Sequence, residues 1–183
     1  RKINTKTEYN SYSKYTDSKK NIELKLLEIS KKVEMEVIII RSPLIYGRDA
    51  PGTFKILHNA IMSNLPLPFG SLKTNRRSYI SINNLLDFIL FVILRTENST
   101  GTFLVSDNND VSTSELVNLM KIKSKSKSII INFPPVLLKL IFFLIGKKNW
   151  IYSTMMPLQI DCLETTNKLG WQPPYALEDE INK

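Results

Sequence analysis

A change of hydrophobic period within residues 15–40 constrains the fold of this chain more than any other feature. In residues 15–35 apolar side chains recur about every 3.6 residues with charges between them, which predicts an amphipathic helix. These side chains are Ile22, Leu26, Leu27 and Ile29. The β-branched run Val37-Ile38-Ile39-Ile40 follows and ends just ahead of Ser42-Pro43. Because such a run is typical of a strand covered on both faces in a parallel sheet, the pair predicts an α/β domain.

The alternation of helix and strand continues along the rest of the chain. Apolar spacing predicts helices over residues 53–64, 85–94 and 112–122, and alternating or β-branched runs predict strands over 79–82 and 102–105. Asn83 or Asn84 is expected to cap the second of these helices. Ser112 and Glu115 form a capping-box pattern at the third. A last helix is expected from about Leu158 to a stop at Gly170.

The apolar stretch over residues 129–145 raises the question of a membrane span. It has 17 residues, is interrupted by Asn132 and Pro134-Pro135, and carries Lys139 in its second half. A span needs about 20 apolar residues, so no membrane span is expected. We expect a buried helix that starts at the prolines, with a helix lying at a membrane surface as the alternative.

Composition narrows the class of protein. A length of 183 residues with 43% apolar and 23% charged residues fits one globular domain. The formal net charge of +8 favours an anionic partner. Lysines are spread along the chain except in one run, Lys121, Lys123, Lys125 and Lys127, which we expect to be a solvated loop after a helix. Nucleic-acid binding is therefore not expected.

Cysteine and histidine usage excludes several kinds of site. Cys162 is the single cysteine, so it cannot form a disulfide within the chain, and the N-terminus lacks the apolar core of a signal peptide. Both features predict a cytoplasmic location. With His58 as the single histidine, neither a zinc site nor a Cys/His nucleophile is expected, and no metal is assigned.

Tyr15 and Lys19 form a spacing with a chemical use. They are four residues apart on the expected helix, so both side chains emerge on one face. A nearby cation favours the phenolate and lowers the pKa of a phenol from about 10, which makes a base available closer to neutral pH. The pair is therefore a candidate acid/base site, with an ordinary surface pair as the alternative.

Further segments give this pair a context. They are Tyr15-Thr16-Asp17-Ser18-Lys19, Ile40-Arg41-Ser42-Pro43-Leu44-Ile45-Tyr46-Gly47, Pro66-Leu67-Pro68-Phe69-Gly70, Arg76-Arg77-Ser78-Tyr79-Ile80 and Leu169-Gly170-Trp171-Gln172-Pro173-Pro174. In this order they resemble the extended short-chain dehydrogenases/reductases, in particular the NAD-dependent epimerases and dehydratases of nucleotide sugars. The run of features looks most like the UDP-sugar 4-epimerase branch and covers nearly the whole chain from Tyr15 onward.

The resemblance implies roles for individual residues. Tyr15 is the expected acid/base, and Lys19 is expected to bind the nicotinamide ribose and lower the pKa of Tyr15. Pro43 is expected to lie against the nicotinamide and Leu44 to face the sugar. Phe69 is expected to border the uracil, and Arg77 to pair with the diphosphate. The implied substrate is a UDP-hexose or a UDP-N-acetylhexosamine, used in polysaccharide biosynthesis, and the implied cofactor is NAD, with NADP left open.

Two departures limit what the chain is expected to contain. None of its six glycines has the spacing of the dinucleotide fingerprint, and the family's third catalytic residue, a Ser or Thr, lies further upstream of the tyrosine than 14 residues allow. Ser153 also stands near the place where relatives tend to carry a diphosphate-binding arginine. The resemblance therefore implies a C-terminal part: the end of a Rossmann-type parallel sheet plus a small substrate-binding α/β lobe.

The expected organisation is a single incomplete domain over residues 1–183. It divides into a polar loop (1–14), the active-site helix and strand (15–47) and a mainly substrate-binding portion (48–183). An N-terminal half on the same or a separate chain is expected to complete the enzyme, and a homodimer is left open. The alternative is an inactive remnant or partner-binding module of the same fold, and a third reading is a protein of the membrane surface.

Overall fold

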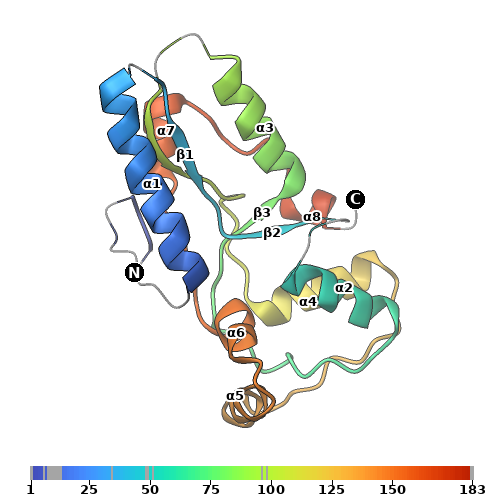
Figure 1. The fold of residues 1–183 in the computed structure, drawn as a ribbon. Coiled ribbons are helices and arrows are strands. Elements are labelled where there is room, and N and C mark those ends of the chain that lie inside the picture. The colour runs from blue at the N-terminus through green and yellow to red at the C-terminus, as the bar shows by residue number, and fades with distance from the viewer. Residues whose placement is uncertain are drawn as a thin grey trace.

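A computed structural model of the chain describes residues 2–5, 7, 14–33, 35–47, 50, 52–95, 97 and 99–181, with side chains in the first helix from Asp17 onward. Figure 1 shows the elements in chain order. They are α1 (Lys14–Val33), β1 (Ile38–Arg41), β2 (Leu44–Tyr46), α2 (Thr53–Met62), β3 (Tyr79–Ser81), α3 (Ile82–Ile93), β4 (Gly101–Leu104), α4 (Thr113–Lys123), α5 (Pro135–Leu144), α6 (Lys148–Trp150), the π-helical turn η1 (Ile151–Met155), α7 (Leu163–Leu169) and α8 (Leu177–Glu180).

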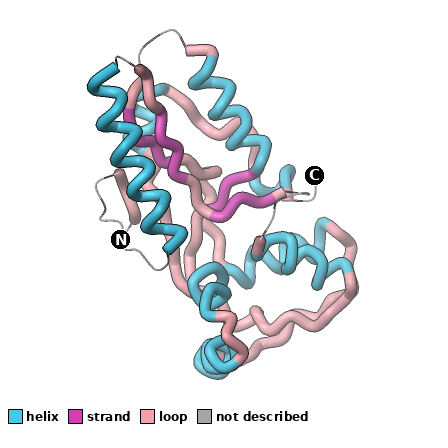
Figure 2. The backbone as a smooth tube through the Cα atoms, in the orientation of Figure 1, coloured by secondary structure: helices cyan, strands magenta, loops and turns pink. Residues whose placement is uncertain are grey.

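The strands form two small parallel sheets, drawn in magenta in Figure 2. β1 pairs with β4 from Ile38 opposite Gly101 to Arg41 opposite Leu104. β2 pairs with β3, with Leu44 opposite Tyr79. The parallel pairing and the helical crossovers confirm the expected α/β class. β2 was not expected from the sequence, because three residues directly after a proline give no usable alternation.

Two hydrophobic clusters cover these sheets. In the first, Phe88 of α3 packs edge-on against Trp171 with ring centroids 5.0 Å apart, and the indole Nε1 donates a hydrogen bond to Asp87 at 2.8 Å. In the second, α2 and α4 bury facing apolar residues, among them Phe54, Leu57, Ile61, Leu116, Val117 and Met120. The first cluster supports β1 and β4, and the second lies below β2 and β3 in Figure 1.

Two of the expected helix ends are confirmed. The Ser112 side chain accepts a hydrogen bond from the Glu115 backbone while the Glu115 carboxylate accepts one from the Ser112 backbone, so the capping box is complete. Gly170 ends α7 in the left-handed conformation, with φ 76°, which a residue without Cβ adopts without strain.

Two other expected ends were wrong. α3 is capped by the Ser81 side chain, which accepts from the Asn84 backbone at 3.0 Å, because the helix begins directly at the end of β3. α7 begins at Leu163 and not near Leu158. The residues between them pair as extended chain, Leu158 with Arg77 and Ile160 with Ile3, and those bridges prevent an earlier helix. Ile3 lies within the segment that was expected to be a polar loop.

The prediction of a buried helix that starts at the prolines is confirmed for the start of the helix and wrong for its burial. α5 does begin at Pro135, but it buries only Leu138 and Phe142, which faces Trp150 at a ring separation of 5.6 Å. It packs on α6 and η1 at one end of the molecule, and most of its other apolar side chains are exposed. Within the described ranges, none of the helices combines the length and the apolar character required for crossing a bilayer.

Candidate functional site

Tyr15 and Lys19 both lie in the first two turns of α1. The side chain of Tyr15 lies outside the described residues, whereas Lys19 is exposed. Glu23 continues the same face one turn further on, and its carboxylate accepts hydrogen bonds from Nε of Arg41 at 3.0 Å and from Nη2 at 2.5 Å. This half-buried ion pair fixes the Tyr15 face of α1 to the last residue of β1.

Pro43 and Leu44 follow β1 immediately. α1 runs antiparallel to β1 in Figure 1, so the helix turns ahead of Glu23 extend beyond the carboxyl end of the strand, on the side of Pro43. Pro43 is buried and Leu44 is half-buried. Ligands of open α/β sheets bind outside the carboxyl ends of the strands. The structure therefore brings four sequence-predicted residues, Tyr15, Lys19, Pro43 and Leu44, to the end of the sheet where a ligand is expected.

The remaining two candidates approach the same place through β2. Leu44 pairs with Tyr79 of β3, and Arg77 lies two residues before that tyrosine. Phe69 is almost fully buried in the cluster of α2 and α4, against which Leu44 also packs. Leu44 is thus the residue that connects the α1 side of the candidate site with Phe69 and Arg77.

Arg77 is buried, with 3% of the residue exposed. Its Nη1 donates hydrogen bonds to the carbonyl oxygens of Tyr152, at 3.0 Å, and of Met156. Burial lowers the pKa of Arg77, and the adjacent Tyr79 partly opposes that change. The Nε donor has no hydrogen-bond partner among the described residues. This Nε atom is itself enclosed, and a buried donor is rarely left without a partner.

The carbonyl oxygens that hold Arg77 belong to η1 and the residue after it. Ser153, which stands near the place where an arginine was expected, lies in this π-helical turn and accepts a hydrogen bond from Thr53 at 3.2 Å. Arg76 does not fill that position, because its guanidinium is paired with Glu115 at 2.6 Å on the surface. Of the two adjacent arginines, Arg76 is exposed and Arg77 has the buried guanidinium.

A buried polar network behind the site was missed by sequence reasoning. The Tyr46 hydroxyl donates to Asp107 at 2.5 Å, and the backbone N–H of Ser81 and the Asn84 side chain donate to the same carboxylate. Burial raises the pKa of Asp107, and burial together with the Asp107 charge raises the pKa of Tyr46. The network fixes β2 to the start of α3. The sequence indicated Tyr46 only as part of a motif and Asn84 only as a possible helix cap.

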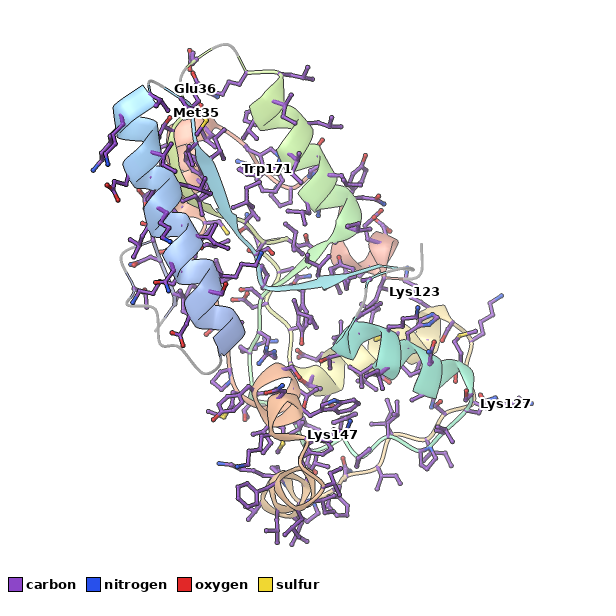
Figure 3. All side chains as sticks on the ribbon, viewed as in Figure 1. Met35, Glu36, Lys123, Lys127, Lys147 and Trp171 are labelled. Carbon is purple, nitrogen blue, oxygen red and sulfur yellow. The ribbon has the colours of Figure 1, made fainter. Side chains whose placement is uncertain are left out.

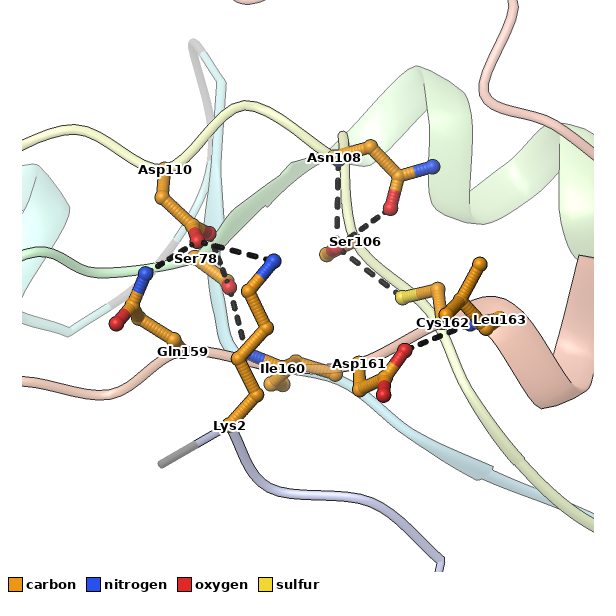
Figure 4. A network of polar contacts seen from close by, with 10 residues as sticks. All are labelled: Lys2, Ser78, Ser106, Asn108, Asp110, Gln159, Ile160, Asp161, Cys162 and Leu163. Atoms are coloured by element: carbon orange, nitrogen blue, oxygen red, sulfur yellow. Dashed lines mark hydrogen bonds and ion pairs between the residues drawn. The ribbon is translucent and has the colours of Figure 1, made fainter.

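A second network, shown in Figure 4, fixes the residue beside Arg77. Ser78 donates to Asp110 at 2.5 Å and accepts from the Ile160 backbone at 2.8 Å, while Gln159 donates to the other Asp110 oxygen at 2.8 Å. Cys162 lies at the edge of this network, buried and 3.2 Å from the Ser106 hydroxyl. Burial raises the pKa of its thiol, so the sulfur has the character of a packed core atom and not of a nucleophile.

The described side chains contain no group of three or more His, Cys, Asp or Glu arranged to hold a metal ion. The described residues of the candidate site provide an exposed ammonium in the first turns of α1, a proline-leucine edge at the end of a parallel strand, and a buried guanidinium. No protein-family model matches the chain.

A search of curated proteins found a relative of clear similarity. The chain is 37% identical over 165 residues to a UDP-glucose 4-epimerase of Vibrio cholerae, and the match covers 90% of this chain and 50% of that protein. The chain is therefore similar to enzymes of the NAD-dependent epimerase/dehydratase family. It corresponds to the C-terminal part of such enzymes, and it spans about half the length of the curated relative it matches.

Solved structures of epimerases and dehydratases share the fold. A UDP-glucuronic acid 4-epimerase from Bacillus cereus in complex with NAD has a TM-score of 0.73 at 13% identity, over 99% of this chain and 54% of that one. A dTDP-glucose 4,6-dehydratase from Bacillus anthracis in complex with NAD has 0.72 at 16%, over 99% and 53%. A UDP-glucose 4-epimerase from Thermotoga maritima with UDP-glucose has 0.67 at 15%, over 94% and 52%. The expected Rossmann-type architecture is confirmed.

The buried Asp107 gives the folding stability of this chain a testable pH dependence. Its pKa in the folded chain is raised above the ordinary 3.8, so the folded state holds the proton more tightly than the unfolded state. The stability that this supplies is complete below the unfolded pKa and is lost as the pH rises through the folded pKa. Urea unfolding between about pH 4 and pH 7 should show a larger fall in the free energy of unfolding for the wild type than for Asp107→Asn.

Asp179→Asn is the matched control, because it removes a carboxylate from the exposed side of α8. We expect its profile to follow the wild type. If the free energy of unfolding changed with pH in the same way for the wild type and for Asp107→Asn, the burial of Asp107 would have no pH-dependent effect on stability.

Proposed function

We propose that this chain is the substrate-binding part of an NAD-dependent nucleotide-sugar epimerase that acts on a UDP-hexose or a UDP-N-acetylhexosamine. The observation that carries the proposal is the 37% identity over 165 residues to a UDP-glucose 4-epimerase. The position of the candidate residues at the carboxyl end of a parallel strand supports it. The single buried Cys162, without a disulfide partner, supports a cytoplasmic location.

In this proposal Tyr15 removes the proton from the sugar hydroxyl and later returns it. Lys19, on the same face one turn away, stabilises the phenolate. The Glu23–Arg41 ion pair keeps that face at the end of β1. Turnover requires that the keto sugar rotate before reduction, so the contacts to its ring must be weaker than the contacts to its nucleotide.

The residues at the end of β1 fit the edge of a nicotinamide. Pro43 offers a buried apolar surface without a backbone N–H, and Leu44 offers a half-buried one on the sugar side. Lys19 would hold the nicotinamide ribose. When bound, NAD supplies the acceptor and donor of the hydride, and the protein orients it.

The nucleotide is assigned to the other side of Leu44. Arg77 would pair with the diphosphate through its unpartnered Nε and its fixed positive charge, while Phe69 would border the uracil. Since Nη1 is already held by two carbonyl oxygens, the guanidinium is oriented before the ligand arrives. We further propose the division into an active-site helix and strand (15–47) and a mainly substrate-binding portion (48–183).

A second candidate is an inactive remnant or partner-binding module of the same fold. Ser153 favours it, because relatives tend to carry near this place an arginine that would contribute a second cation to the diphosphate, whereas η1 contains none. One guanidinium would bind the nucleotide more weakly than two. The loss in binding free energy would be a few kcal/mol if the missing contact were buried and bidentate.

Calorimetric titration with NAD and with UDP tests the proposed division of labour. We expect the 183-residue chain to bind NAD no better than about millimolar, because none of its glycines has the spacing that cradles a pyrophosphate. UDP should bind more tightly than NAD, through Arg77. Sub-micromolar binding of NAD by this chain would refute the assignment of the cofactor site to the other half.

A further inference from the structure

α5 combines two properties that do not normally occur together. Its sequence, Pro-Val-Leu-Leu-Lys-Leu-Ile-Phe-Phe-Leu, is apolar around the whole helix except for Lys139. A helix of this composition is usually enclosed by other protein or by lipid. Here only Leu138 and Phe142 are buried, whereas Val136 is 79% exposed and Leu144 is 72% exposed. The outward face is therefore largely apolar, which is a property of many interaction sites.

The segment of the chain that contains α5 carries charge of one sign. Residues 116–160 contain seven lysines and no acidic residue, so this segment supplies +7 of the formal net charge of +8. Lys147 and Lys148 follow the helix directly, and the Lys148 ammonium lies 4.5 Å from the centre of the Phe143 ring. Figure 3 shows Lys147 beside α5 and Lys127 on the loop that leads to it from α4. None of the seven lysines forms an ion pair with another described residue.

These features discriminate between the possible occupants of the face. In a two-fold dimer the same surface meets itself, so a second copy would bring lysines against lysines. An anionic bilayer offers both complements at once, acyl chains for the apolar side chains and phosphate headgroups for the ammonium groups. With ten residues, α5 is about 15 Å long, which suits a helix lying in the interface and not a span.

We propose that α5, with Lys139, Lys147 and Lys148, docks this protein onto an anionic membrane surface. In Figure 1 α5 lies at the lower end of the molecule, beyond α6, whereas the end of α1 that follows Lys25 and the end of α3 lie at the upper end. The proposal does not depend on the assigned reaction.

Co-sedimentation of the full chain with lipid vesicles tests the proposal. We expect sedimentation with vesicles of mixed phosphatidylglycerol and phosphatidylcholine, little with phosphatidylcholine alone, and release by high salt. Val136→Ser with Leu144→Ser should weaken the partition by about tenfold or more, because two aliphatic side chains no longer enter the interface. Lys147→Glu with Lys148→Glu should weaken it by about tenfold.

Matched controls come from the other end of the molecule. Ile93→Ser with Leu94→Ser removes two aliphatic side chains of similar exposure, 68% and 77%, from the end of α3. Lys25→Glu with Lys31→Glu makes the same charge change on exposed positions of α1. Both control variants should bind vesicles as the wild type does. Light scattering should give the same particle mass for the wild type and for the α5 variants.

Three results would overturn the proposal. The first is no difference between anionic and neutral vesicles. The second is equal loss of binding in the α5 variants and their controls. The third is a lack of vesicle binding together with a smaller particle mass for Val136→Ser with Leu144→Ser, which would identify the face as a contact between copies of the chain.

Discussion

Tyr15→Phe is expected to lower the turnover of UDP-glucose by about 10²- to 10⁴-fold in an enzyme completed by the missing half. The completed enzyme would join this chain to the half of the Vibrio cholerae relative that it does not match. The phenylalanine preserves the ring but has no proton to transfer, so binding of UDP should be nearly unchanged. Steady-state kinetics together with a UDP titration measure both quantities.

The control for this substitution is Tyr175→Phe, which removes the hydroxyl of an exposed tyrosine ahead of α8. It should leave turnover at the wild-type value. Lys19→Met gives a second readout, because loss of the neighbouring cation should move the pH–rate profile to higher pH. Unchanged turnover in Tyr15→Phe would remove Tyr15 from the mechanism.

Arg77→Met is expected to reduce both folding stability and nucleotide binding. The substitution leaves the carbonyl oxygens of Tyr152 and Met156 without their buried donor, which should lower the free energy of unfolding by about 2–4 kcal/mol. Loss of the proposed diphosphate contact should weaken UDP binding by about 100-fold. Urea unfolding and calorimetric titration separate the two effects.

The adjacent Arg76 is the matched control for Arg77. Its partner Glu115 is half exposed, as is Arg76 itself, so Arg76→Met should change the free energy of unfolding by no more than about 1 kcal/mol. Arg77→Lys keeps the charge but not the planar fork, and should recover part of the stability and little of the affinity. If Arg77→Met behaved like Arg76→Met in both assays, Arg77 would be neither the anchor of η1 nor the diphosphate ligand.

The sequence predicted local structure well where the signal itself was local. The helical period of residues 15–35, the β-branched run before Ser42 and the capping box at Ser112 each correspond to an observed element. Tertiary pairing decided the places where prediction failed. Leu158 is held extended by its bridge to Arg77, and Ser81 caps α3 because β3 ends there.

The residues in and behind the candidate site also fall into those that local sequence predicts and those that depend on tertiary structure. Tyr15, Lys19 and Pro43 were accessible from spacing and resemblance, because they are adjacent in sequence to strong secondary-structure signals. Asp107 was not, because its role depends on Tyr46, Ser81 and Asn84, which only the fold brings together. The exposure of α5 was also invisible, since an apolar helix has the same sequence whether protein, lipid or water surrounds it.

The central claim is that this chain carries the substrate side of a UDP-sugar epimerase. The most direct test is the interconversion of UDP-glucose and UDP-galactose by the completed wild-type enzyme, with UDP-N-acetylglucosamine as a second substrate. We expect turnover of at least one of them, and its loss in Tyr15→Phe. A completed protein that folds and binds NAD but converts neither substrate would contradict the account and favour an inactive remnant of the same fold.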